Sequence, residues 1–116
     1  MFKVIRQYIG PLEPRSRVVL EFPYENLNVI HMQASCGCTD PRTDPVRQVV
    51  TVTFEAPGIP PHLVQEKKNT VTTNKTITVK YVDKDDPYEK DGKTTKVKLE
   101  TLIFTATIVD TKLNFN

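Results

Sequence analysis

Apolar and polar residues alternate along most of this chain, and the alternation predicts β-strands. Val18, Leu20 and Phe22 share one parity, and Val50 and Phe54 repeat the pattern further on. A period of two is typical of a strand with one buried face. The alternating or β-branched segments predicted as strands are residues 2–9, 16–22, 27–34, 47–55, 70–82 and 96–109.

Proline, glycine and charged residues separate these segments. Gly10-Pro11 is expected to end the first strand, and residues 40–45 carry two turn signals, Asp40-Pro41 and Asp44-Pro45. Residues 56–68 contain three prolines, which remove ladder donors, so this segment is predicted as a long loop or edge crossover between two sheets. Residues 83–95 are predicted as a charged loop longer than a tight hairpin needs.

The last strand segment changes its apolar parity. Val97 and Leu99 share one parity with each other, whereas Leu102 and Phe104 lie on the other. A bulge or bend near residues 100–101 would reconcile the two patterns. No internal repeat and no convincing amphipathic helix interrupts the strand pattern.

Six or seven short strands without a helical pattern predict an all-β protein. We expect an immunoglobulin-like antiparallel β-sandwich of about seven strands, without the Cys…Trp…Cys core of antibody domains. The 116 residues are enough for one buried core. Residues 1–116 are therefore predicted to form a single domain, in which 110–116 are a C-terminal tail.

Composition and charge limit the classes of partner that are expected. Hydrophobic residues make up 38% and charged residues 26% of the chain, and the net charge is only +2. This balance is typical of a globular protein and implies no specific nucleic-acid partner. No apolar run approaches the roughly 20 residues of a membrane helix, so no membrane partner is expected. The N-terminal segment MFKVIRQYIG lacks the apolar region of a secretory signal.

The two cysteines are the strongest candidates in the sequence for metal binding or redox chemistry. Cys36 and Cys38, with His31 and His62, are weak candidates for a tetrahedral zinc site. Structural zinc sites favour two to four residues between paired cysteines, however, and only Gly37 separates these two. A disulfide across one residue would have to meet narrow geometric limits. The favoured interpretation is that Cys36 packs as a small apolar side chain; metal binding and disulfide or redox chemistry remain open.

Other catalytic or cofactor chemistry finds no support in the residues. Only two histidines are present and no matched serine or aspartate motif accompanies them, which argues against a nucleophilic triad. The acidic run DKDDPYEKDG lacks the ligand spacing of an EF-hand loop, and its lysines neutralise it. We therefore predict a protein that is not an enzyme and has no cofactor.

The signature Ser35-Cys36-Gly37-Cys38-Thr39 and three strand segments carry a resemblance to a known family. The segments are QVVTVTFEA, KTITVKYVD and TLIFTATIV. Together they resemble a bacterial immunoglobulin-like domain family of unknown function with a Ser-Cys-Gly-Cys-Thr signature, related to Hydin-type and major-sperm-protein-like sandwiches. The resemblance implies a binding or scaffolding module. Many members carry an export signal, so it also implies the periplasm as an alternative location.

The expected function is a non-enzymatic structural module of a large assembly. The particular expectation is a bacteriophage virion protein, capsid-decorating or tail-associated, made in the host cytoplasm, with capsid or tail proteins as partners. The alternative is a free adaptor or periplasmic binding domain that recognises protein or glycan partners. The residues expected to make the contacts lie in the two long loops and the tail: Pro57, Pro60, Pro61, Asp86, Tyr88, Asp91 and Phe115.

Overall fold

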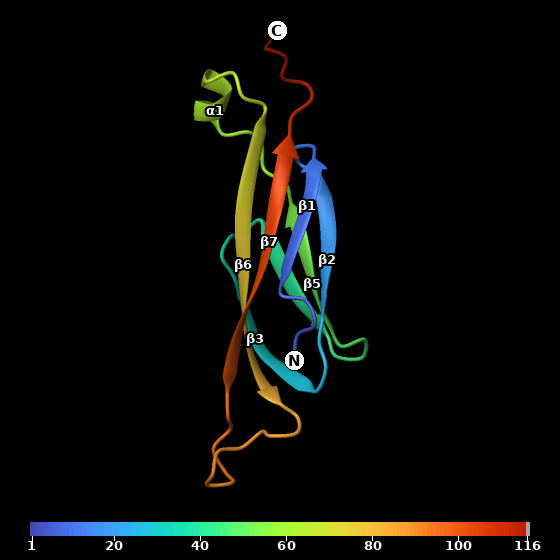
Figure 1. The fold of residues 1–116 in the computed structure, drawn as a ribbon, viewed down its shortest axis with the longest axis vertical. Coiled ribbons are helices and arrows are strands. Elements are labelled where there is room, and N and C mark those ends of the chain that lie inside the picture. The colour runs from blue at the N-terminus through green and yellow to red at the C-terminus, as the bar shows by residue number, and fades with distance from the viewer. Residues whose placement is uncertain (116) are drawn as a thin grey trace.

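The computed structural model describes residues 1–115, which form seven strands and one short helix. The strands build two packed sheets, ordered β1-β7-β6-β3 and β2-β5-β4 (Figure 1). This is the predicted all-β sandwich. The elements are β1 (Arg6–Leu12), β2 (Arg17–Pro23), β3 (Leu27–Ala34), β4 (Thr39–Asp44), β5 (Val49–Glu55), α1 (Pro61–Gln65), β6 (Thr70–Asp83) and β7 (Lys98–Val109).

One pairing departs from the antiparallel prediction. β1 runs parallel to β7, from the pair Arg6–Ile103 to the pair Leu12–Ile108, whereas the other strand pairs are antiparallel. A parallel pair requires a crossover connection. Here all the other strands come between β1 and β7 in the sequence. The first and last strands therefore lie next to each other, and β1 forms one edge of the larger sheet (Figure 1).

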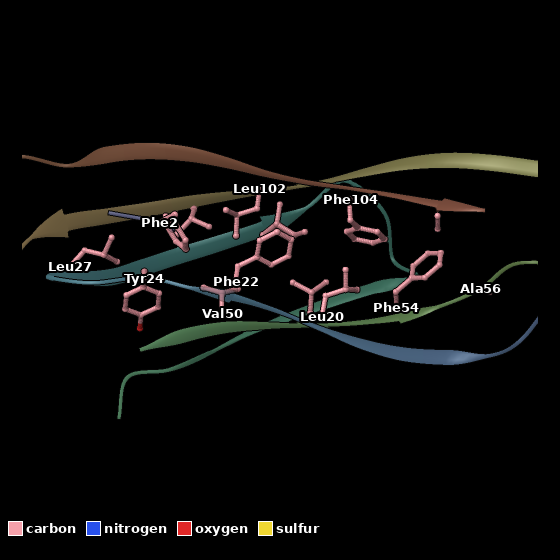
Figure 2. Close-up of a cluster of buried hydrophobic side chains, with 14 of the residues drawn as sticks. Phe2, Leu20, Phe22, Tyr24, Leu27, Val50, Phe54, Ala56, Leu102 and Phe104 are labelled. Carbon is pink, nitrogen blue, oxygen red and sulfur yellow. The ribbon is translucent and has the colours of Figure 1, made fainter. Parts of the chain in front are cut away.

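The core fills the space between the two sheets. The alternating residues of β2 and β5 point inward as predicted, and Phe22, Val50, Val52 and Phe54 are fully buried. Phe54 packs edge-to-face on Phe104 of the other sheet, with ring centroids 5.1 Å apart (Figure 2). Such aromatic pairs add about 0.5–1.5 kcal/mol beyond the area they bury. The aromatic contact therefore joins the sheets directly.

Residues 39–44, predicted as consecutive turns, form strand β4. The prediction was wrong because it treated Pro41 as a breaker, although proline is tolerated on an edge strand. β4 has one neighbour, β5, and Pro41 lies opposite Val52. The turn that was expected at Asp44-Pro45 does follow, and the Asp44 carboxylate accepts hydrogen bonds from the backbone N–H groups of Val46 and Arg47, both 3.1 Å.

The sequence analysis expected Gly10-Pro11 to end the first strand. This prediction was wrong, because β1 continues to Leu12. Gly10 has a φ of 128°, and a Cβ there would lie 2.6 Å from the backbone oxygen of Thr107. Glycine thus permits the close approach of β1 to β7. The predicted start of this strand was also early: Phe2 forms only an isolated bridge with Tyr24.

The segment 56–68 crosses between the sheets, as predicted, but it contains the short helix α1, which the sequence analysis did not expect. Pro61 occupies the first turn of α1, where the missing proline N–H costs nothing. The helix has five residues and no buried side chain. Within residues 1–115, no helix is long and apolar enough to cross a membrane.

The bulge predicted near residues 100–101 is absent from the β6–β7 pairing, which stays in register from Thr70–Val109 to Tyr81–Lys98. Leu99 keeps the strand parity and is simply exposed, at 62%. The irregularity lies in β3 instead, between Val29 and His31. Ile30, which lies within this irregularity, is 54% exposed.

Candidate functional site

β6 and β7 form a long two-stranded ribbon that runs the length of the molecule, which measures 66 × 25 × 18 Å. β1 lies beside β7 only from Ile103 onward, and β3 lies beside β6 only from Ile77 onward. The two neighbours therefore flank different strands of the ribbon, at its opposite ends. Because β6 and β7 cross over between these ends, β1 and β3 both lie to the right of the ribbon in Figure 1. At one end β6 is the edge of the sheet, over residues 70–75; at the other end β7 is the edge, over residues 98–102.

The hydrogen bonds on either side of these segments show where the free backbone groups point. Thr76 accepts a bond from the Ser35 N–H at 2.9 Å, on the side of β6 away from β7. Ile103 donates its N–H to the Ile5 oxygen at 2.8 Å, on the side of β7 away from β6. Successive alternate residues of a strand direct their N–H and C=O groups to the same side. The residues whose backbone groups face the open edges are therefore Thr70, Thr72 and Asn74 on β6, and Leu99 and Thr101 on β7.

The open segment of β6 carries a polar outer face. The Thr105 hydroxyl donates to the Asn74 side-chain oxygen at 2.6 Å, and the hydroxyls of Thr72 and Thr107 lie 3.4 Å apart. These cross-strand contacts hold the edge flat against β7. On the inner side, Lys75 is half-buried opposite the buried Phe104. Lys75 forms none of the ion pairs found within residues 1–115.

The structure divides the predicted contact residues between the two ends of the long axis. The three prolines lie in the connection around α1, which together with the C-terminal tail forms one end (Figure 1). Pro57 and Pro61 are exposed and Pro60 is half-buried at the start of the helix. Phe115, in the tail, is 37% exposed. This end lies beyond the open edge of β6.

Asp86, Tyr88 and Asp91 come together in the β6–β7 loop at the opposite end. The Asp86 carboxylate accepts a bond from the Lys96 Nζ at 2.8 Å, and this hydrogen bond with its charge lowers the pKa of Asp86. The Asp91 carboxylate accepts from the Thr94 hydroxyl and from two backbone N–H groups, which lower its pKa as well. Tyr88 forms a bridge with Thr95 and is 52% exposed. The predicted charged loop is thus ordered by its own polar contacts.

Cys36 and Cys38 form a disulfide, so the favoured prediction of a packed free thiol was wrong. The chain turns at Gly37, where the Thr39 N–H donates to the Cys36 oxygen at 3.2 Å, and the two Cα atoms lie 5.3 Å apart, within the usual range for bridged cysteines. Bonded sulfurs offer no thiolate to a metal. His31 is exposed on β3, and residues 1–115 contain no cluster of three or more histidine, cysteine or acidic side chains suited to a metal ion.

Two features of the candidate sites were missed from the sequence. The positions of the open edges were missed because the alternation of 70–82 predicts a strand but not its neighbours. Thr39 was read only as part of the family signature, although it is buried at 5% exposure and its hydroxyl lies 3.6 Å from the Cys38 Sγ. A threonine next to a cysteine at a strand end was the only available signal.

Comparison with known proteins adds no family. No protein-family model, curated protein or solved structure matches the chain. The resemblance carried by the Ser-Cys-Gly-Cys-Thr signature therefore stays a prediction.

Proposed function

We propose that this chain is a structural subunit of a large protein assembly. The observation that supports the proposal best is the pair of open strand edges, one on β6 and one on β7, at opposite ends of the β6–β7 ribbon. An unpaired edge is a ready template for an extended segment of another chain, because main-chain hydrogen bonds supply the affinity. The partners are other subunits that add a strand to residues 70–75 or 98–102.

The arrangement of the edges favours an assembly with many members. A subunit that offers two different edges makes contacts that differ on its two sides. Such heterologous contacts generate rings where the rotation closes and extended arrays where it does not. The elongated shape keeps the two edges apart, so partners on both can bind at once.

Lys75 gives the β6 edge a chemical preference. An added strand would place side chains next to the inward-facing Lys75, which is half-buried. A charge in such a position discourages indiscriminate strand pairing. A partner strand with a carboxylate opposite Lys75 would pair with it, so we expect an acidic residue in the segment that binds there.

The particular assembly we propose is a bacteriophage virion, in which the chain decorates the capsid or belongs to the tail. The support is analogy at the level of the fold alone: small immunoglobulin-like sandwiches recur as capsid-decorating or tail-associated proteins. The β6–β7 loop and the α1 end, where the predicted contact residues lie, would provide further contacts with capsid or tail proteins.

The Cys36–Cys38 disulfide favours a second candidate, a periplasmic or adaptor domain that binds protein or glycan partners. Disulfides persist in oxidising compartments such as the bacterial periplasm. Fractionation of the source cells distinguishes the two candidates. Recovery in the periplasmic fraction would support the adaptor, whereas recovery with large particles would support the virion subunit.

Sedimentation of source material followed by mass spectrometry tests the assembly directly. We expect the chain to sediment with a particle far heavier than itself, and Thr72→Pro to reduce its incorporation strongly. Proline at 72 removes an N–H that faces the open edge, and its ring blocks an added strand. Thr72→Ala, which keeps the N–H, is the matched control. Equal incorporation of wild type and Thr72→Pro would contradict strand addition at β6.

Deletion of residues 86–91 tests the contact loop separately. These residues lie beyond the ribbon, so the sandwich should keep its fold, checked by circular dichroism. We expect incorporation to be lost because Asp86, Tyr88 and Asp91 are removed together. Normal incorporation of the deletion variant would remove the loop from the set of contacts.

A further inference from the structure

The Cys36–Cys38 disulfide lies on the surface, in the connection between β3 and β4. Gly37 has no atom within 4 Å of the position a Cβ would take. Cys38 lines an open hollow of about 260 Å³, together with Gly37, Arg17 and Glu55. The inner side of Cys38 packs against the core. One sulfur-bearing side chain is thus fixed by the fold and still borders a space large enough for an incoming side chain.

Each of the two sulfurs has its own hydrogen-bond donor. The backbone N–H of Cys38 donates to the Cys36 Sγ at 3.1 Å. The Thr39 hydroxyl lies 3.6 Å from the Cys38 Sγ. Among residues 1–115, Thr39 is the sole buried polar residue, and its hydroxyl forms its hydrogen bond with this sulfur. Donors placed next to a sulfur stabilise it as a thiolate, which is the leaving form in disulfide exchange.

The disulfide contributes little to holding the chain together. A cross-link stabilises a fold mainly by restricting the unfolded chain, and the restriction grows with the length of the loop that it closes. This one encloses a single residue, Gly37. The neighbouring strands β3 and β4 are already held by their own partners, β6 and β5. The two donors and the open hollow therefore indicate a reactive disulfide rather than a cross-link that stabilises the fold.

We propose that Cys36 and Cys38 form a thiol–disulfide exchange site that oxidises thiol substrates. In the first step a substrate thiolate enters the hollow and attacks the Cys38 Sγ. A new bond forms between the two sulfurs, and the Cys36–Cys38 bond breaks with its electron pair on Cys36. The Cys36 thiolate is stabilised by the Cys38 N–H.

In the second step another substrate thiolate attacks the substrate sulfur of the mixed disulfide. The Cys38 thiolate leaves, stabilised by the Thr39 hydroxyl. Two substrate thiols have then lost two electrons and two protons and become a disulfide. Cys36 and Cys38 have gained the two electrons, and they take up protons from water as the pH dictates. The reverse sequence, with an external disulfide as oxidant, restores the starting state. This activity is independent of the proposed assembly function.

The first test exposes the folded chain to reduced glutathione, quenches the reaction with acid and identifies the products by mass spectrometry. We expect a mixed disulfide with glutathione on Cys38, followed by the reduced protein. In Cys36→Ser, which leaves no internal thiol to displace glutathione, oxidised glutathione should convert Cys38 completely to a lasting mixed disulfide. A disulfide that opens only after the chain is unfolded in guanidinium would overturn the proposal.

The second test addresses Thr39, a positioning residue. Reduced Thr39→Val should need a higher pH than wild type for half-maximal alkylation of Cys38 by iodoacetamide, because the thiolate has lost its donor. Its exchange with glutathione should be several-fold slower. Thr39→Ser restores the hydroxyl and should restore both readouts, which a purely structural role would not do. An unchanged pH profile in Thr39→Val would overturn the role of this hydroxyl.

The substrate class is tested with a reduced, unstructured peptide that contains two cysteines. Oxidation of this peptide by the wild-type chain, and its loss in Cys38→Ser, would support protein thiols as substrates. Reaction with glutathione alone would support low-molecular-weight thiols. Val46→Ala serves as the matched control, because Val46 is 90% exposed, lies outside the hollow and leaves both sulfurs in place; it should retain the exchange.

Discussion

The two halves of β6 differ sharply although they belong to one strand. Residues 77–81 lie between β7 and β3, and Ile77 and Val79 are fully buried in the core between the two sheets. Residues 70–75 have β7 as their single neighbour, and the inward Thr73 and Lys75 are only half-buried. One half is part of the core; the other is a margin with free backbone groups.

The difference shows what decides whether a strand is covered. Both halves present threonine or other polar side chains to the outside, so the outer face does not distinguish them. The inward positions do, because Ile77 and Val79 gain from burial whereas Lys75 would lose the hydration of its charge. The inward positions of β6 nearest the boundary, Thr73 and Lys75, are therefore polar where the strand loses its second neighbour, whereas Val71 further along still packs against the core.

The largest expected effect is a difference in the free energy of unfolding between variants in the two halves of β6. Ile77→Ala should lower the free energy of unfolding by about 2–5 kcal/mol, because it leaves a cavity in a fully buried site. Thr73→Ala should cost about 1 kcal/mol or less. Urea denaturation of both variants measures the difference. Equal losses would show that the first half of β6 belongs to the core after all.

The alternation in the sequence was enough to predict the covered parts of the molecule. Val50, Val52 and Phe54 are inward because hydrophobic burial acts on every second residue of β5, whatever its neighbours. Strand partners are different, because pairing depends on segments far apart in the chain. The parallel β1–β7 pair and the open edge of β6 left no local signal, and so they could not be predicted.

Local exceptions account for the other errors. Strand β4 was not predicted because it contains Pro41. A proline is tolerated on an edge strand, but the sequence does not show that β4 lies at the edge of its sheet. The disulfide was undervalued because it depends on the turn at Gly37 that brings the two Cα atoms within 5.3 Å, and the sequence alone does not specify this distance. Of the residues predicted to make contacts, Asp86, Tyr88 and Asp91 lie in one loop because they are close in sequence, and their role in contacts stays a prediction.

A proline comparison sharpens the contrast at the level of single hydrogen bonds. Thr73 directs its backbone groups toward Ala106 of β7, so Thr73→Pro should destabilise the fold by roughly 1–3 kcal/mol, since it leaves a ladder oxygen without its donor. Thr72→Pro should change stability by about 1 kcal/mol or less, because the N–H it removes faces the open edge. Thermal unfolding of the pair gives the result. A reversed order would mean that the hydrogen-bonding parity of β6 is opposite to the one described.

Removing the charge at the boundary should weaken the distinction between the halves. Lys75→Val places a β-branched side chain opposite Phe104, and such a cross-strand pair is worth about 0.2–1 kcal/mol. The same change removes the charge that protects the open edge, so the variant should self-associate as its concentration rises. Urea denaturation and light scattering measure the two effects, with Lys75→Arg as the control. A variant that stays monomeric would show that Lys75 does not guard the edge.

The smallest expected effect concerns the loop that follows the covered half. The pKa of Asp91 is lowered in the folded chain by its bonds from Thr94 and Lys93, so the unfolded chain binds protons more readily there. The contribution of Asp91 to stability is therefore present above the ordinary pKa of 3.8 and is lost as the pH falls through the lowered value. Acid should loosen residues 84–97 before residues 70–75, which contain no acidic side chain. Hydrogen exchange between pH 3 and pH 6 measures the order of opening, with rates corrected for the intrinsic effect of pH. Asp91→Asn should make the loop less sensitive to pH over that interval; an unchanged response would assign the ordering of the loop to the Lys96–Asp86 pair instead.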